Sequence, residues 1–160
     1  MRYTQEDEKI SHSEFGVVRD DEHLLRVIYA PEHIVGGFVI ESAISLEDLS
    51  TRGFSLDREM YKDDTLIEQR IVNQTQKRPD ERQSSFVSKF RCGDARGISV
   101  TYQTNERAFI VIDDAQDDNQ AHASLYSTQD GLKRGALKKL RTLLLPLLQL
   151  NAVRCNSLNN

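Results

Sequence analysis

Residues 108–148 decide the expected fold, and they read AFIVIDDAQDDNQAHASLYSTQDGLKRGALKKLRTLLLPLL. The first five residues are apolar and rich in β-branched side chains, as in a buried strand, and residues 121–126 could form one more strand. Within 132–148, leucines recur at spacings of three and four residues, which predicts a long amphipathic helix. Pro146 lacks an amide hydrogen, so we expect this helix to kink or break close to Leu145.

Upstream of this stretch, the sequence predicts further strands. Four segments have the composition and alternation of strands, namely residues 38–46, 53–59, 85–92 and 98–103. Turn residues follow the last two of these segments. The run from 85 to 112 is therefore expected to form an antiparallel meander.

Two other segments carry helix signals. Residues 20–29 open with acidic side chains, which predicts a short helix or a helix-to-strand transition that ends before Pro31. Residues 63–65 can cap a helix over 66–72, and the polar run 73–85 is expected to be a loop. The sequence thus predicts an α+β fold. It would contain a mostly antiparallel sheet of about five strands, a mid-chain helix and a long C-terminal amphipathic helix on one face.

The length of 160 residues fits one domain over residues 1–160, with loose N-terminal residues 1–12 and a polar C-terminal tail, 156–160. The chain is 38% hydrophobic and 29% charged, which is typical of a soluble globular protein. The net charge of −4 provides no general attraction to nucleic acid or to an anionic membrane.

The expected location is the cytoplasm. No apolar run approaches the ~20 residues that a membrane span requires, and the acidic N-terminus lacks the apolar segment of a signal peptide. Cys92 and Cys155 are too few for a disulfide framework or a zinc site, so both are expected to be reduced thiols.

The loop 113–118 contains four aspartates, with His122 shortly after it. Such a group can hold a divalent cation or divide acid and base roles, which makes Asp113 and Asp117 candidate binding residues. No second acidic cluster completes a metal site, so we predict neither a metal nor another cofactor. The alternative interpretation is a solvated turn.

Arg26 is flanked by apolar residues on both sides. It either lies at the edge of the core or points into a cleft, where it needs a carboxylate or phosphate partner. Arg58 is a second candidate cation, although its neighbour Asp57 makes a surface pair the commoner interpretation. His122 is either a structural imidazole or a group that transfers protons. The arginine, serine and late glutamate of mono-ADP-ribosyl transferases are incomplete here, because no strand-like glutamate follows Glu106.

Residues 24–31, 42–44, 53–58 and 118–123 together resemble a set of small, uncharacterised bacterial proteins. Those proteins carry a glycine-leucine-serine-valine-like strand and a late Asn-Pro-Ala-His-Ala element, and this chain has Gln120 in place of the proline. The resemblance covers roughly residues 20–126 and implies a bacterial origin but no activity. It marks five residues for joint testing: Arg26, Ser55, Arg58, Asn119 and His122.

The leading functional hypothesis is a small cytoplasmic protein-interaction module or accessory subunit. Residues 143–150 are apolar nearly all round, which is more than one sheet face needs. Leu144, Leu147 and Leu148 are therefore the predicted contacts with a protein partner or with a second copy of the chain. The basic face of the same helix could bind nucleic acid, but the acidic remainder of the chain makes this unlikely.

The alternative hypothesis is an enzyme that acts on a phosphorylated or nucleotide substrate. Arg26 or Arg58 would hold the phosphate, and His122 would transfer a proton. The loop 113–118 would order a metal or a ribose. This hypothesis predicts that these residues converge in one cleft within a few ångströms, and that Arg26 and His122 do not lie on opposite faces of the sheet.

Overall fold

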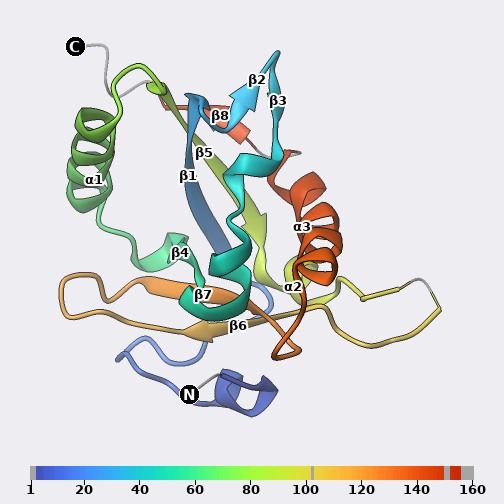
Figure 1. Cartoon of the computed structure of the whole chain (residues 1–160). Coiled ribbons are helices and arrows are strands. Elements are labelled where there is room, and N and C mark those ends of the chain that lie inside the picture. The colour runs from blue at the N-terminus through green and yellow to red at the C-terminus, as the bar shows by residue number, and fades with distance from the viewer. Residues whose placement is uncertain (1–2, 102, 150–151, 156–160) are drawn as a thin grey trace.

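The structure is a computed structural model that describes residues 3–101, 103–149 and 152–155. Within these residues, six strands form one antiparallel sheet in the order β6-β7-β4-β1-β5-β8 (Figure 1). The strands are β1 (His23–Pro31), β4 (Phe54–Arg58), β5 (Arg82–Arg91), β6 (Phe109–Asp113), β7 (His122–Ser127) and β8 (Ala152–Arg154). A separate hairpin consists of β2 (Ile34–Val35) and β3 (Phe38–Val39).

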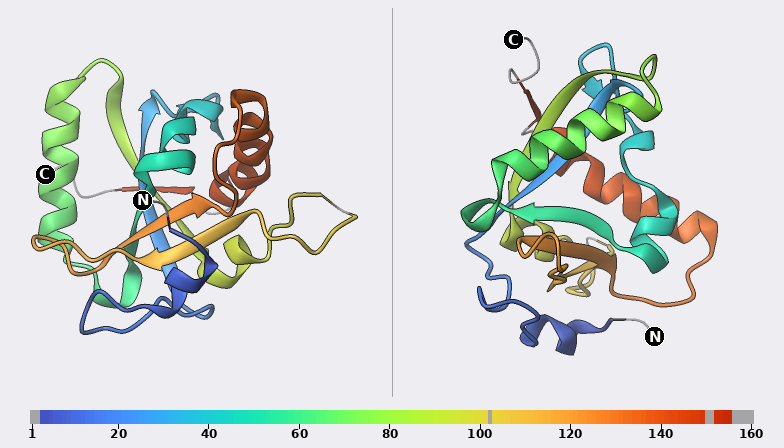
Figure 2. Two further views of the ribbon diagram at one scale, coloured as in Figure 1. Left: turned by 60° about the horizontal axis from the view of Figure 1, so that its bottom comes forward. Right: turned by 90° about the vertical axis from the view of Figure 1, so that its left-hand side faces the viewer.

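Two long helices flank the sheet on opposite sides, as both figures of the whole chain show (Figures 1 and 2). The α-helices are α1 (Asp64–Lys77), the short α2 (Cys92–Arg96) and α3 (Arg134–Gln149). Shorter helical turns are η1 (Gln5–Lys9), η2 (Glu41–Ala43), η3 (Asp48–Arg52) and η4 (Glu59–Tyr61). The α+β prediction is confirmed. No helix in the described part of the chain combines the length and apolar composition needed to cross a membrane.

The helix α3 forms one wall of the main core. Its leucines at positions 137, 140, 144 and 148 recur every three or four residues, so they lie on one side of the helix and are all buried. They share a hydrophobic cluster with Phe54 and Leu56, which alternate with polar residues along β4. Pro146 lies inside α3, which continues to Gln149, so the helix does not break at Leu145.

The sequence predicted β4, β5, β6 and β7 within a few residues of their observed bounds, as well as α3. The segment predicted over residues 20–29 forms the strand β1, which begins at His23, and the helix expected in this segment is wrong. β-Branched and aromatic side chains from Val27 to Tyr29 favour the extended backbone and override the acidic start.

Two predicted strands are wrong. The strand expected over 38–46 ends at Val39, and residues 41–43 and 48–52 form helical turns. Ala43, Ile44 and Leu49, in or next to these turns, are buried and contribute apolar side chains to the core. The strand prediction is wrong because a short apolar run does not distinguish a strand from a helical turn. The described residues of the second segment, 98–101 and 103, form no strand of the sheet, and a single bridge joins Ser99 to Arg107.

The polar run 73–85 is mostly not a loop. The helix α1 extends to Lys77 and β5 begins at Arg82, which leaves a connection of four residues. Glutamine and lysine are good helix formers, so the exposed last turn of α1 needs no apolar residue to form. The predicted meander over 85–112 is also wrong, because three strands separate β5 from β6 in the sheet.

The N-terminal segment covers the outer edge of β6. The carboxylate of Glu8 accepts a hydrogen bond from the Val111 amide at 2.8 Å, and Arg96 donates to the Val111 carbonyl oxygen at 2.8 Å. Glu8 also pairs with Arg96 and Arg107. These side chains take up the main-chain groups that an edge strand leaves open.

The sheet divides between β1 and β4. The strand β1 pairs with β5 along its whole length, but it pairs with β4 only at Leu24–Arg58 and Leu25–Asp57. Beyond Leu25 the two strands separate, and this gap positions the candidate site.

Candidate functional site

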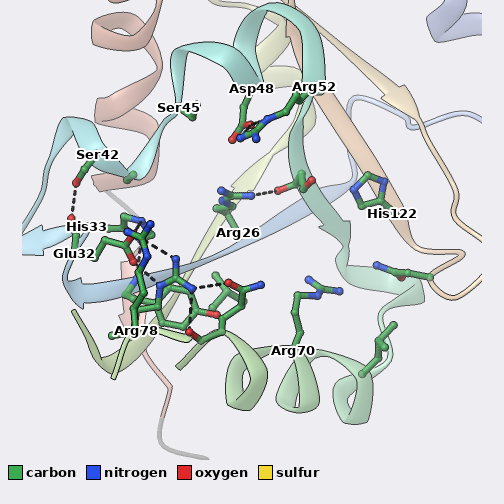
Figure 3. Close-up of a pocket in the computed structure, with 18 of the residues that line it drawn as sticks. Arg26, Glu32, His33, Ser42, Ser45, Asp48, Arg52, Arg70, Arg78 and His122 are labelled. Carbon is green, nitrogen blue, oxygen red and sulfur yellow. Dashed lines mark hydrogen bonds and ion pairs between the residues drawn. The ribbon is translucent and has the colours of Figure 1, made fainter. Parts of the chain in front are cut away.

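A cleft of about 620 Å³ occupies the gap between β1 and β4 (Figure 3). Helix α1 supplies one wall, the segment 42–52 supplies another, and the loop before β7 closes one end. This volume lies in the range typical of small-molecule sites. The lining is rich in arginine, with Arg26, Arg52, Arg70, Arg78 and Arg82 all contributing side chains.

Arg26 lies at the centre of the cleft in Figure 3. Its Nη1 donates to the Ser55 carbonyl oxygen at 2.9 Å, and its guanidinium carbon lies 4.3 Å from the centroid of the Phe54 ring. Its Nε is buried and has no hydrogen-bond partner in the described structure. Burial lowers the pKa of the Arg26 guanidinium, which means that the site disfavours the cation as it stands.

The other four arginines of the cleft each have a carboxylate partner. The pairs are Arg52 with Asp48 at 2.8 Å, Arg70 with Asp57 at 2.7 Å, Arg78 with Glu32 at 3.3 Å and Arg82 with Glu32 at 2.5 Å. Among the described residues, Arg26 forms no ion pair. The cleft therefore contains one arginine whose charge is not compensated by a direct contact.

His122 begins β7 and lines the same cleft. Its Nδ1 lies 2.7 Å from the carbonyl oxygen of Asp114, and a carbonyl only accepts, so Nδ1 carries a hydrogen. In the neutral ring, Nε2 is then the nitrogen with a free lone pair. This arrangement fixes the orientation of the ring and leaves Nε2 available to a ligand.

His33 also lines the cleft but has the opposite tautomer. Its Nδ1 accepts a hydrogen bond from the Tyr29 amide at 3.0 Å, so the hydrogen of the neutral ring is on Nε2. Burial, together with the charges of Arg26, Arg82 and Arg78, lowers the pKa of His33 to about 4 despite the opposing effect of Glu32. At neutral pH, His33 is therefore an uncharged hydrogen-bond donor.

Asp57 connects three walls of the site. Its carboxylate accepts two hydrogen bonds from Arg70 of α1, at 2.7 and 3.2 Å, and one from Asn119 Nδ2 at 2.8 Å. The main-chain oxygen of Asn119 in turn accepts a hydrogen bond from the His122 amide. This buried carboxylate holds the loop that carries His122 against β4 and α1.

Alternation along the strands assigns Arg26 and His122 to different faces of the sheet. Leu25, Asp57 and His122 are cross-strand neighbours and share a face, whereas Arg26 belongs to the opposite one. Because β1 and β4 separate beyond Leu25, the Arg26 side chain enters the gap and reaches Ser55. The expectation that the two residues share a face of the sheet is therefore wrong, but both line one cleft because the strands separate.

Four of the five residues marked for joint testing line the cleft, namely Arg26, Ser55, Asn119 and His122. The fifth, Arg58, lies on the core side of β4. It forms hydrogen bonds at 2.9 Å with both carboxylate oxygens of Glu22 and donates to the main-chain oxygens of Gly16 and Val17. Arg58 is thus occupied by protein partners and does not contact the cleft.

The acidic loop divides into separate environments. Asp113 is buried and accepts hydrogen bonds from residues 11–13, whereas Asp117 is exposed and does not line the cleft. Asp118 does line it. Across the described residues, no group of three or more His, Cys, Asp or Glu side chains could hold a metal ion.

The leucines proposed as partner contacts pack against the domain itself. Leu144 and Leu148 are fully buried, and Leu147 is half-buried against the main core. Between residues 134 and 149, no leucine is exposed. The largest exposed apolar side chain of the neighbouring hairpin is Phe38, which is 66% exposed.

Sequence reasoning missed much of the cleft, including His33, Arg70, Arg78 and Arg82. Three of these residues could have been found from the sequence, because arginine is concentrated between residues 70 and 82. Most of this segment was predicted to be a loop, so its arginines were not considered as site residues.

The chain matches no known protein family, no curated protein and no solved structure. The resemblance to small bacterial proteins therefore stays a prediction.

Proposed function

We propose that this protein is an enzyme that acts on a phosphorylated small molecule, with the phosphate bound by Arg26. The observation that carries the proposal is the state of Arg26. It lies in a cleft, has a buried Nε without a hydrogen-bond partner and forms no ion pair within the described structure.

A phosphate would satisfy what the protein leaves open at Arg26. Burying a cation without an anionic partner is costly, and the planar guanidinium fork matches the oxygens of a phosphate. The other four arginines of the cleft already pair with carboxylates, with Arg78 and Arg82 sharing Glu32, so they can add hydrogen-bond donors beside Arg26. The ligand's anionic group would therefore bind beside Ser55.

His122 would transfer the proton in the reaction. Its Nδ1–H is held by the Asp114 carbonyl oxygen, which leaves Nε2 to accept a proton from the substrate or return one. Arg26 and His122 would then have separate roles, the first in binding and the second in turnover. Separate roles make the two parts of the proposal separately testable.

Binding is tested by titrating the protein with inorganic phosphate in a calorimeter. We expect Arg26→Ala to weaken phosphate binding roughly ten- to hundredfold, because hydrogen bonds to a charged group contribute about 1.5–3 kcal/mol. The matched control is Arg19→Ala, since Arg19 is an exposed arginine paired with Asp21 and lies outside the cleft. Equal affinity in wild type and Arg26→Ala would refute the assignment.

Turnover is tested by incubating wild type and His122→Ala with a panel of phosphorylated metabolites and following the products by ³¹P NMR. Loss of a general acid or base costs about a hundredfold or more in rate. His122→Ala should therefore lose turnover while it binds phosphate within about a factor of three of wild type. Equal turnover in both proteins would exclude His122 as the proton-transfer group.

The protein-interaction hypothesis stays a prediction. The covered leucines of α3 do not provide the exposed apolar surface on which it was based. Native mass spectrometry would test it, because a stoichiometric protein partner or a defined homo-oligomer would support that hypothesis.

A further inference from the structure

We infer that the phosphorylated ligand of this cleft is a sugar phosphate and not a nucleotide. The inference rests on the proposed function, and it concerns the part of the ligand that Arg26 does not hold. Three properties of the lining carry it: the available aromatic surface, the unpaired polar groups and the number of unpaired cations.

The cleft offers no open aromatic face for a base. The aromatic rings among its described lining residues are those of Tyr29, His33 and His122, and all three are largely buried: Tyr29 and His122 are each 6% exposed, and the His33 side chain is 12% exposed. The Arg82 guanidinium lies 5.3 Å from the centroid of the Tyr29 ring, and the His33 ring lies 5.9 Å away from it. Protein sites for unstacked bases commonly use aromatic rings or guanidinium planes. Here the Tyr29 ring is already covered.

Two guanidinium planes of the cleft are also covered on one side, since Arg26 lies over the Phe54 ring and Arg82 over the Tyr29 ring. The N–H edges of the four arginines other than Arg26 are directed at carboxylates. The remaining apolar lining is small and consists of Val27, Ala43 and Leu66.

Several polar side chains of the lining have unused hydrogen-bonding capacity. The hydroxyls of Ser45 and Ser55, the Gln116 side-chain amide and the Asp118 carboxylate make no hydrogen bond to another described residue. Hydroxyl and amide groups both donate and accept, and a carboxylate accepts. Such a set is complementary to the several hydroxyls of a sugar.

The number of unpaired cations indicates one phosphate. Arg26 alone lacks a carboxylate partner among the described arginines of the cleft, because Arg78, which shares Glu32 with Arg82, also pairs with Glu81 at 3.1 Å; one anionic group beside Arg26 would therefore give every arginine of the cleft an anionic partner. A diphosphate would require a second arginine to leave its carboxylate. The geometry therefore favours a sugar monophosphate.

The test compares three probes on the whole protein by calorimetry: inorganic phosphate, ribose 5-phosphate and adenosine 5′-monophosphate. We expect ribose 5-phosphate to bind about tenfold more tightly than phosphate, through two or more additional hydrogen bonds. Adenosine monophosphate should bind no more tightly than ribose 5-phosphate. If it binds about tenfold more tightly, the base is recognised and the inference is overturned, although the proposed function stands.

The sugar contacts are tested with Gln116→Ala. This variant should weaken ribose 5-phosphate binding about three- to tenfold and leave phosphate binding unchanged, because Gln116 makes no hydrogen bond to Arg26 or Ser55, where the anion would bind. Asp117→Asn is the matched control, since Asp117 is the exposed neighbour that does not line the cleft. Equal affinities for phosphate and ribose 5-phosphate would overturn the sugar assignment alone. Failure of all three probes to bind would overturn the proposed function with it.

Discussion

Arg58 and Glu22 form a bidentate ion pair inside the protein, with Arg58 Nε and Nη2 each 2.9 Å from a carboxylate oxygen and both side chains 1% exposed. The pair joins β4 to the residue just before β1, 36 positions away in the sequence. Removing the Glu22 charge leaves the buried Arg58 without its bidentate partner and with only the more distant Asp113 carboxylate, 3.9 Å from Nη1, as an anionic neighbour. We expect Glu22→Gln to lower the free energy of unfolding by about 3–5 kcal/mol.

Chemical denaturation measures this loss. The control is Asp94→Asn, which removes an exposed pair with Arg91 and should cost less than about 1 kcal/mol. If the two variants lose the same stability, the buried pair has no special role.

Asp113 anchors the N-terminal segment to the end of β6. Its Oδ2 accepts from the amides of His12 and Ser13, both at 2.9 Å, and from the hydroxyls of Ser11 and Ser13. Asp113→Asn should lower the free energy of unfolding by about 1.5–3 kcal/mol, because these hydrogen bonds to a charged acceptor become weaker. Hydrogen exchange should show faster exchange at the amides of residues 12 and 13. Asp117→Asn, in the exposed part of the same loop, should change neither quantity.

His33 makes stability depend on pH. Its pKa in the folded protein is about 4, below its ordinary value of 6.5, so the unfolded chain binds more protons between these values. Stability should therefore fall as the pH is lowered from about 6.5 to about 4. His33→Asn keeps an acceptor for the Tyr29 amide and should flatten this part of the curve.

The measurement is the denaturation midpoint as a function of pH. The control is His23→Asn, because His23 is an exposed histidine at the start of β1 and does not line the cleft, and its curve should follow that of wild type. A His33→Asn curve with the same slope as wild type between pH 6.5 and 4 would contradict the assignment.

Gly53 ends η3 next to the cleft, with a backbone φ of +88°. A Cβ at this position would lie 2.7 Å from the Tyr126 hydroxyl oxygen. Gly53→Ala should therefore cost about 2 kcal/mol or more in the free energy of unfolding, from backbone strain and the clash together. Gly131→Ala separates the two effects, since Gly131 has a φ of +63° and open space around it. Thermal unfolding of both variants checks this, and equal losses would exclude the clash.

Elements with strong local patterns could be predicted from the sequence. The leucine spacing predicted α3, and apolar runs bounded by turns predicted β5 and β6. The order of the strands could not be predicted, because a local pattern does not identify a partner strand. The short segment 38–46 was ambiguous for the same kind of reason, since its apolar residues suit helical turns as well as a strand.

The cleft was only partly predictable. Apolar flanks drew attention to Arg26, and the isolated imidazole drew attention to His122. That both residues line one cleft depends on the early separation of β1 from β4, which is a tertiary property. Arg58 had the same residue type and a similar context, and it is on the same face of the sheet as Arg26. It lies where β1 and β4 are still paired, however, and Glu22 holds its side chain.

The covered edge of β6 has a consequence for assembly. Glu8 and Arg96 occupy the main-chain groups of Val111, so another chain cannot pair with β6 at this position. Glu8 belongs to the N-terminal segment, which thus opposes strand exchange and fibril growth on that side of the sheet. Removing this segment would free the Val111 amide and make the edge of β6 more prone to aggregation.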